Sequence, residues 1–220
     1  MTTATARHSG PITPAIANQT KSYIALSEQA YSNRSNQTPV KDFTFVGDGK
    51  IMLTQNLKGD ARLAQMGKID DSGFAASVYR NDKTKEFVVA YRGTECTTQW
   101  RQNCNSPLHW TANDFKADEE ARRGYLTAQY QYGSDLAKVV ADLRKDPRYK
   151  DYNVVLTGHS LGGGIANYAA SKNGNLATWT FNPARNPLST RDNPNARNIY
   201  AIGDPVGDPD TYRVFGLESS

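Results

Sequence analysis

Residues 153–166, which read Asn-Val-Val-Leu-Thr-Gly-His-Ser-Leu-Gly-Gly-Gly-Ile-Ala, decide the fold class of this chain. Residues 153–157 form an apolar, β-branched run that predicts a buried strand. Residues 161–172 predict a helix that begins four residues later. The sequence between them is G-x-S-x-G centred on Ser160, and this motif between a strand and a helix is typical of a nucleophile elbow.

The elbow interpretation makes specific demands on the backbone. Glycines two residues before and two residues after Ser160 would let the backbones pass closely, with Ser160 held in a strained conformation above the sheet edge. Ser160 would then face the positive end of the following helix, and the amide of Leu161 could face a developing oxyanion. The alternative is a glycine-rich turn without chemistry, which explains the strand and helix context less well.

Outside this stretch, the sequence predicts alternating strands and helices. A hairpin turn is expected at residues 81–84, because Asn-Asp-Lys-Thr separates two apolar alternating runs. Strands are predicted at 74–79, 86–91, 176–181 and 197–202, and helices at 13–31 and about 124–143. This order predicts an α/β fold with a mainly parallel central sheet flanked by helices.

The length of 220 residues fits one domain. Residues 1–11, rich in Thr and Ala, are interpreted as a flexible leader, and residues 12–220 as the domain. No run approaches 18 apolar residues, and no apolar run follows the N-terminus, so neither a membrane span nor a conventional secretory signal is expected. The protein is therefore expected either to be secreted or periplasmic by another route or to be cytoplasmic.

Composition excludes few partners. The chain has 26 basic and 22 acidic residues, a net charge of +4. This mild surplus would favour an anionic bilayer by about 1 kcal/mol for each well-placed basic residue, although a surface of mixed sign explains it equally well. No basic block is interleaved with aromatic residues, so nucleic acid is not expected as a partner. The three histidines are scattered, and no metal-ligand spacing occurs.

Three segments together resemble the class 3 lipases of the α/β-hydrolases. Residues 158–163, Gly-His-Ser-Leu-Gly-Gly, are similar to their elbow signature, and residues 90–94, Ala-Tyr-Arg-Gly-Thr, are similar to their strand ending in [FY]-R-G-[ST]. Residues 198–206 resemble the strand that delivers the acid of the triad. The resemblance covers about residues 12–208.

The resemblance implies a role for particular residues. Ser160 would be the nucleophile, Thr94 and Leu161 would supply the oxyanion-hole amides, and Asp204 would be the acid of the triad. Asp208 and Asp210 are rivals for the acid, and both Thr94 and Asp204 could instead be ordinary strand-end or turn residues. His159 is not expected to be the base, because the neighbour of the nucleophile in an elbow directs its side chain elsewhere.

The chain departs from the family pattern at the catalytic histidine. The base should follow the acid, but no histidine occurs between Asp204 and Ser220. The favoured interpretation is that a further C-terminal segment carries it. The alternatives are that His109 serves, against the family's order, or that the chain is a non-catalytic binding module. Loss of a triad residue lowers the rate on the order of 10⁴- to 10⁶-fold.

The family resemblance also implies a lid between residues 95 and 115. This segment carries Trp100 and Trp110, and it would cover Ser160 in water and open on a lipid surface, unless it simply packs on the core. Cys96 and Cys104 lie within it. They would close a short disulfide loop in an oxidising compartment or stay as free thiols in a reducing one.

Substrate and partners follow from the resemblance alone. Acyl esters of lipids are implied, cleaved by a lipase or phospholipase A1 at a membrane surface, without a metal or organic cofactor. Some bacterial relatives with this elbow are phospholipase effectors paired with an inhibitor or immunity protein, which suggests such a partner here. The alternatives are an esterase for soluble esters and a pseudoenzyme that binds lipid or protein.

Overall fold

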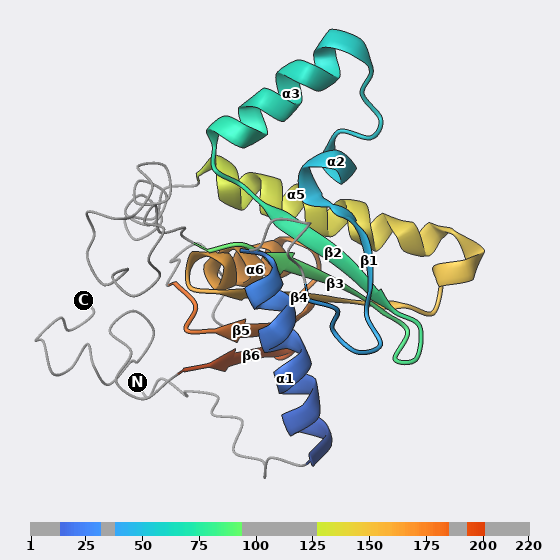
Figure 1. The fold of residues 1–220 in the computed structure, drawn as a ribbon, viewed down its shortest axis with the longest axis vertical. Helices are drawn as coiled ribbons and strands as arrows, with labels where there is room; N and C mark the ends of the chain where they lie inside the picture. The colour runs from blue at the N-terminus through green and yellow to red at the C-terminus, as the bar shows by residue number, and fades with distance from the viewer. Residues whose placement is uncertain (1–13, 32–37, 94–126, 185–192, 201–220) are drawn as a thin grey trace, which may run out of the picture.

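The computed structural model describes residues 14–31, 38–93, 127–184 and 193–200. These residues form a six-stranded sheet whose spatial order equals the chain order (Figure 1). The strands are β1 (Thr44–Asp48), β2 (Ala76–Asn81), β3 (Glu86–Tyr91), β4 (Asn153–His159), β5 (Ala177–Phe181) and β6 (Ala196–Ile199). The helices of at least five residues are α1 (Pro14–Gln29), α2 (Gly49–Leu53), α3 (Gly59–Asp71), α5 (Ala128–Asp142) and α6 (Leu161–Lys172).

The sheet changes direction at β3. β1, β2 and β3 pair antiparallel, whereas β3, β4, β5 and β6 pair parallel. Parallel strands bring their carboxyl ends to the same edge of a sheet, where α/β proteins place ligands. The loops that follow β3, β4, β5 and β6 therefore all begin at one edge.

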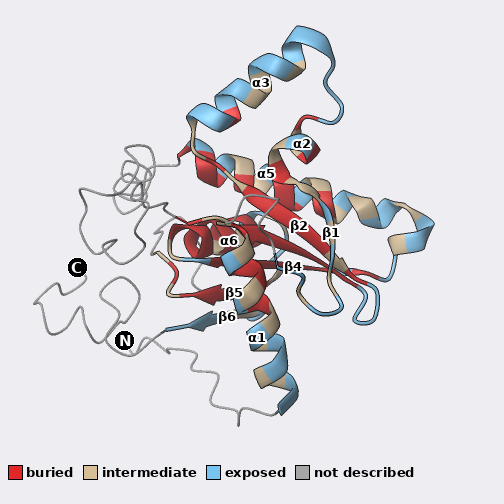
Figure 2. Cartoon of the chain, in the orientation of Figure 1, coloured by how far each residue is buried: buried red, intermediate tan, exposed pale blue. Residues whose placement is uncertain are grey.

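Side-chain alternation along β3 and β4 divides the core into two layers. Phe87, Val89 and Leu156 point into the cluster under α5 and α6. Val88 and Val155 point into the opposite cluster, which α1 covers. Figure 1 shows α1 on one side of the sheet and α5 and α6 on the other. Every residue of β3 is buried, so this strand runs through the centre of the core (Figure 2).

The fold confirms the predicted α/β class with its mainly parallel sheet. The helix at 161–172, the strand at 86–91 and the hairpin turn at 81–84 occur where the sequence predicts them. The strand predicted at 74–79 begins at Ala76, because Phe74 packs into the core before the pairing starts. The predicted long helix is observed as α5, followed by a 3₁₀ turn at Leu143–Lys145.

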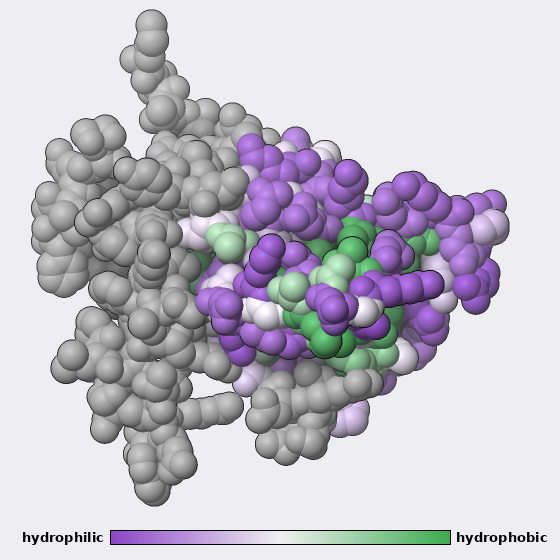
Figure 3. Space-filling view, turned by 90° about the horizontal axis from the view of Figure 1, so that it is seen from above, coloured by the Kyte–Doolittle hydropathy of each residue, from purple (hydrophilic) through white to green (hydrophobic). Residues whose placement is uncertain are grey.

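The segment that carries β1, α2 and α3 was not predicted, since its apolar spacing is weak. α3 buries Ile69 alone among its residues, and Leu63 is 68% exposed. Seen from the side on which α3 lies, the described surface is mainly hydrophilic with apolar residues between (Figure 3). Helices of this kind are stabilised by contacts with the rest of the protein rather than by their own apolar spacing.

No helix among the described ranges has the length and apolar character needed to cross a bilayer. The predicted leader (1–11), the lid segment with Cys96 and Cys104, and the C-terminal residues from 201 onward lie outside the described residues.

Candidate functional site

Ser160 alone separates β4 from α6. Its backbone has φ 53° and ψ −126°. A residue with a Cβ adopts such a conformation at a cost of about 1–3 kcal/mol, and it does so where the surroundings hold it there. The strained turn that the sequence predicted is therefore present. The Ser160 side chain makes no capping hydrogen bond to α6, so its hydroxyl is not used to close the helix.

Hydrogen bonds on both sides hold the backbone of Ser160. Its amide donates to the carbonyl oxygen of Phe181 at 3.0 Å. Its carbonyl oxygen accepts from the amide of Gly164 at 3.1 Å and from the amide of Ala184 at 2.9 Å. Because these partners lie in α6, at the end of β5 and in the loop that follows β5, elements besides its own strand determine the conformation of Ser160.

The two glycines of the elbow motif lie where backbones cross. A Cβ on Gly158 would lie 2.8 Å from the amide nitrogen of Gly163, and a Cβ on Gly162 would lie 2.8 Å from the carbonyl carbon of Arg92. Contacts with Cβ atoms are essentially never this short, so each position requires glycine. The start of α6 therefore packs directly against the end of β3.

The two following glycines serve a different contact. A Cβ on Gly163 would lie 2.9 Å from the Cβ of Pro183, and a Cβ on Gly164 would lie 2.7 Å from the hydroxyl of Tyr130. These neighbours belong to the loop after β5 and to α5. The glycine run that disfavours a helix by propensity is thus explained by close packing on three sides.

The end of β3 is anchored beside the elbow. The amide of Arg92 donates to the carbonyl oxygen of Ala75 at 3.0 Å, and its guanidinium donates to the carbonyl oxygen of Gly73 at 2.9 Å. A Cβ on Gly93 would lie 2.5 Å from the carbonyl oxygen of His159. Gly93 therefore lies beside His159, and Thr94, the next residue, lies outside the described residues.

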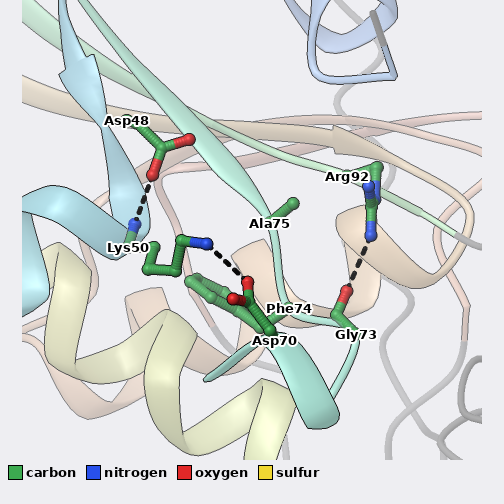
Figure 4. Close-up of a pocket in the computed structure, with 7 residues that line it drawn as sticks. All are labelled: Asp48, Lys50, Asp70, Gly73, Phe74, Ala75 and Arg92. Atoms are coloured by element: carbon green, nitrogen blue, oxygen red, sulfur yellow. Dashed lines mark hydrogen bonds and ion pairs between the residues drawn. The ribbon is translucent and has the colours of Figure 1, made fainter. Parts of the chain in front are cut away.

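A polar cleft adjoins Arg92 (Figure 4). Both carboxylates of the cleft have a partner in Lys50. Its ammonium contacts the Asp70 carboxylate at 2.6 Å, and its backbone amide donates to the Asp48 carboxylate at 2.9 Å. Figure 4 shows the Arg92 guanidinium directed at Gly73 from the opposite wall. The cleft thus ties the ends of β1, α3 and β3 together.

The side chain of His159, which precedes Ser160, is directed at Tyr31. Its Nδ1 lies 3.3 Å from the hydroxyl of Tyr31, which also donates to the carbonyl oxygen of His159 at 3.5 Å. The two rings lie 6.4 Å apart between centroids. The His159 side chain is thus directed at Tyr31, in keeping with the expectation that it is directed away from the role of the base. Tyr31 lies in the range of the helix predicted at 13–31, and no sequence signal connects it to the elbow.

The predicted acid comes from a strand that ends at the same edge. His159 pairs with Phe181, and Phe181 pairs with Ile199. The amide of Asn182 donates to the carbonyl oxygen of Ile199 at 2.8 Å, which closes this edge. Asp204 lies five residues beyond Ile199 and outside the described residues, as do Asp208, Asp210 and His109.

The described part of the site holds no metal-binding group of three or more His, Cys, Asp or Glu. The electrostatic features at the edge are instead the N-terminus of α6, which carries unpaired N–H groups and a partial positive charge, and the buried Tyr91 beneath Gly162. Burial raises the pKa of Tyr91 above its usual range, and its hydroxyl donates to the carbonyl oxygen of Gly133 at 2.8 Å. Tyr91 is therefore a neutral structural donor.

The family model of the Tle-like phospholipase domain matches residues 22–201. This chain belongs to that family. The match begins within α1 and ends one residue beyond the last described residue, so it contains the whole described site from Arg92 onward.

Relatives of known structure share the fold. A fungal lipase solved with an inhibitor, as a model for interfacial activation, superposes with a TM-score of 0.58 and 18% identity, covering 92% of this chain and 77% of that chain. The Rhizomucor miehei lipase in complex with its propeptide superposes with a TM-score of 0.54 and 17% identity, covering 92% and 66%. The chain thus has the α/β-hydrolase fold of these lipases.

A closer sequence match is the extracellular phospholipase A1 of Serratia liquefaciens. It is 36% identical over 113 residues, which are 51% of this chain and 28% of the Serratia protein. The match therefore spans about a quarter of the length of that relative.

Proposed function

We propose that this member of the Tle-like phospholipase family hydrolyses acyl esters of phospholipids, with Ser160 as the nucleophile. The observation that carries the proposal is the strained backbone of Ser160, which three hydrogen bonds hold between β4 and the N-terminus of α6. A serine is kept at such a cost where its position matters for chemistry. The match to the Serratia phospholipase A1 favours phospholipids over glycerides.

In the proposed mechanism, the Ser160 hydroxyl gives its proton to the general base and attacks the ester carbonyl. The ester C–O bond breaks, the alcohol leaves with that proton, and water hydrolyses the acyl-enzyme to the fatty acid and free Ser160. The amide of Leu161, the first N–H of α6, is the proposed first oxyanion donor. The second donor is the amide of Thr94, supported by the position of Gly93 against His159. Removal of one such donor costs about 3 kcal/mol in the transition state.

Asp204 is the proposed acid, supported by the register that brings β6 to the edge of the elbow. The general base must be a histidine other than His159, since the Nδ1 of His159 lies against Tyr31. The candidates are His109 and a histidine supplied from outside the 220 residues. We further propose that the protein acts peripherally on a membrane outside the cell that makes it, where an inhibitor protein would protect the producing cell.

The test is fatty-acid release from phosphatidylethanolamine and phosphatidylglycerol vesicles by the chain and by its Ser160→Ala variant. If His109 is the base, the 220-residue chain should release fatty acid, and Ser160→Ala should lose on the order of 10⁴-fold. A His109→Ala variant that is equally inactive would identify the base. If the base lies outside the 220 residues, release that depends on Ser160 should occur only with a natural chain extended to include that histidine. Release that persists in Ser160→Ala, or vesicle binding without release even by the extended chain, would contradict the proposed function and favour a binding module.

A further inference from the structure

Three segments that are distant in the sequence meet at the hydroxyl of Tyr31. Tyr31 follows the C-terminal end of α1, and its amide donates to the carbonyl oxygen of Glu28 at 3.1 Å. Its hydroxyl lies 3.3 Å from Nδ1 of His159 and donates to the carbonyl oxygen of His159 at 3.5 Å. A Cβ on Gly93 would overlap the same hydroxyl. One oxygen atom therefore touches α1, the elbow and the end of β3.

The partners of this hydroxyl are the residues next to the reacting groups. His159 precedes Ser160, and Gly93 precedes Thr94. The Tyr31 hydroxyl and the His159 carbonyl oxygen both lie against Gly93. They therefore lie between the elbow and the end of β3. Other hydrogen bonds also hold these two stretches of backbone. Ser160 bonds to Phe181 and Ala184, and the amide of Arg92 donates to the carbonyl oxygen of Ala75.

We propose that Tyr31 is a positioning residue, which sets the distance between the elbow and the end of β3 and so aligns the oxyanion donors with Ser160. This inference rests on the proposed function. Oxyanion donors must lie at hydrogen-bond distance, about 2.7–3.1 Å, from the developing charge, and a displacement of about 1 Å costs about 100-fold in rate. Among the described residues, the hydroxyl contacts His159 and Gly93, which flank the reacting groups, so its removal acts on alignment and not on the chemistry itself.

The structure offers a matched pair of tyrosines for the test. Tyr31→Phe removes the hydroxyl at the elbow. Tyr152→Phe removes a hydroxyl that donates to Asp82 at 2.7 Å, just before β4 begins and at the opposite end of that strand from the elbow. Both changes keep the ring and delete one hydrogen-bonding oxygen. A difference between the two variants therefore reports the place of the hydroxyl and not the loss of a hydroxyl as such.

We would measure kcat and KM for phospholipid vesicles, the melting temperature, and amide hydrogen exchange in peptides that contain Gly93 and Leu161. For Tyr31→Phe we expect kcat to fall between about tenfold and 100-fold, KM to change little, and exchange to increase in those two peptides. Its melting temperature should resemble that of Tyr152→Phe, which should keep the wild-type kcat. A purely structural role would lower the melting temperature and leave kcat of the folded enzyme unchanged.

The outcomes separate the inference from the proposed function. If the wild-type chain is active and Tyr31→Phe keeps its kcat, the positioning role is overturned while the proposed function stands. If neither the 220-residue chain nor a chain extended to carry the base releases fatty acid, the proposed function fails, and hydrogen exchange decides the inference. Faster exchange confined to the Gly93 and Leu161 peptides in Tyr31→Phe would then support it, and exchange equal to that of Tyr152→Phe would overturn it.

Discussion

The backbone of Ser160 has a strained conformation, which hydrogen bonds to α6, β5 and the loop after β5 hold in place. The φ of 53° is compatible with an L-residue only because the amide and the carbonyl oxygen are both bonded to neighbouring elements. The glycines on either side make this possible, since Gly158 and Gly162 leave no Cβ between the crossing backbones. The requirement for glycine is therefore steric here rather than conformational.

This argument predicts opposite effects for two Gly→Ala changes in helices. Gly162→Ala should lower the free energy of unfolding by about 1–3 kcal/mol or more, because its Cβ would overlap the end of β3. Gly67→Ala in α3 should raise the free energy of unfolding by about 0.5–1 kcal/mol, because no atom lies within 4 Å of its Cβ and alanine favours a helix. Urea unfolding of both variants is the measurement. Equal effects would show that the packing at Gly162 is looser than the structure has it.

At the scale of elements, the β2–β3 hairpin and the β4–α6 unit are local structures that the rest of the sheet assembles around. In the hairpin, the side-chain oxygen of Asn81 accepts from the amides of Lys83 and Thr84 at 3.0 Å and 3.2 Å. This arrangement offers the turn its hydrogen bonds before any distant strand arrives. Asn81 is 4% exposed, so its side chain is held by packing where it accepts both bonds.

The hairpin prediction compares two neighbouring side chains. Asn81→Ala should lower the free energy of unfolding by about 0.5–1.5 kcal/mol, because two amides of the turn lose their side-chain acceptor. Lys83→Ala removes an ion pair to Asp42 at 2.6 Å, but the Lys83 side chain is 71% exposed, so its effect should stay within about 0.5 kcal/mol. Thermal unfolding followed by circular dichroism would measure both. A larger loss in Lys83→Ala than in Asn81→Ala would refute the account of the turn.

At the scale of the whole molecule, the elbow lies where the parallel strands end, and a buried carboxyl group lies where they begin. Glu86 begins β3 there and is 7% exposed, and the hydroxyl of Tyr23 from α1 donates to it at 3.0 Å. Burial raises the pKa of Glu86 above its ordinary value, against the lowering effect of hydrogen bonds from Thr84 and Tyr23. Burial, followed by the charge of Glu86, also raises the pKa of Tyr23.

The raised pKa of Glu86 predicts how stability depends on pH. A carboxyl group whose pKa is raised on folding stabilises the fold below its unfolded pKa, and this contribution is lost as the pH rises through the folded pKa. The free energy of unfolding of Glu86→Gln relative to the native chain should therefore grow from pH 4 towards pH 7, since the amide keeps an acceptor for Tyr23. Urea unfolding at several pH values would measure this difference. A difference that is constant with pH would contradict the prediction.

Some features of this protein were determined by the sequence alone, because they depend on neighbours in the chain. The elbow around Ser160, the helix at 161–172, the hairpin at 81–84 and the α/β class all follow from local spacing, turn residues and glycine content. The family resemblance rested on the same short motifs, and the family match confirms it. The assigned roles of Ser160, Thr94, Leu161 and Asp204 stay predictions.

Other features were decided only by the tertiary structure, because they depend on contacts between distant segments. α2 and α3 have too weak an apolar pattern to be read from the sequence, and the chain around them determines their place. The separate partners of the glycines at 162–164 lie in β3, in α5 and beyond β5. Tyr31 stands 128 residues from His159, and only the packing of α1 on the sheet brings its hydroxyl to the elbow.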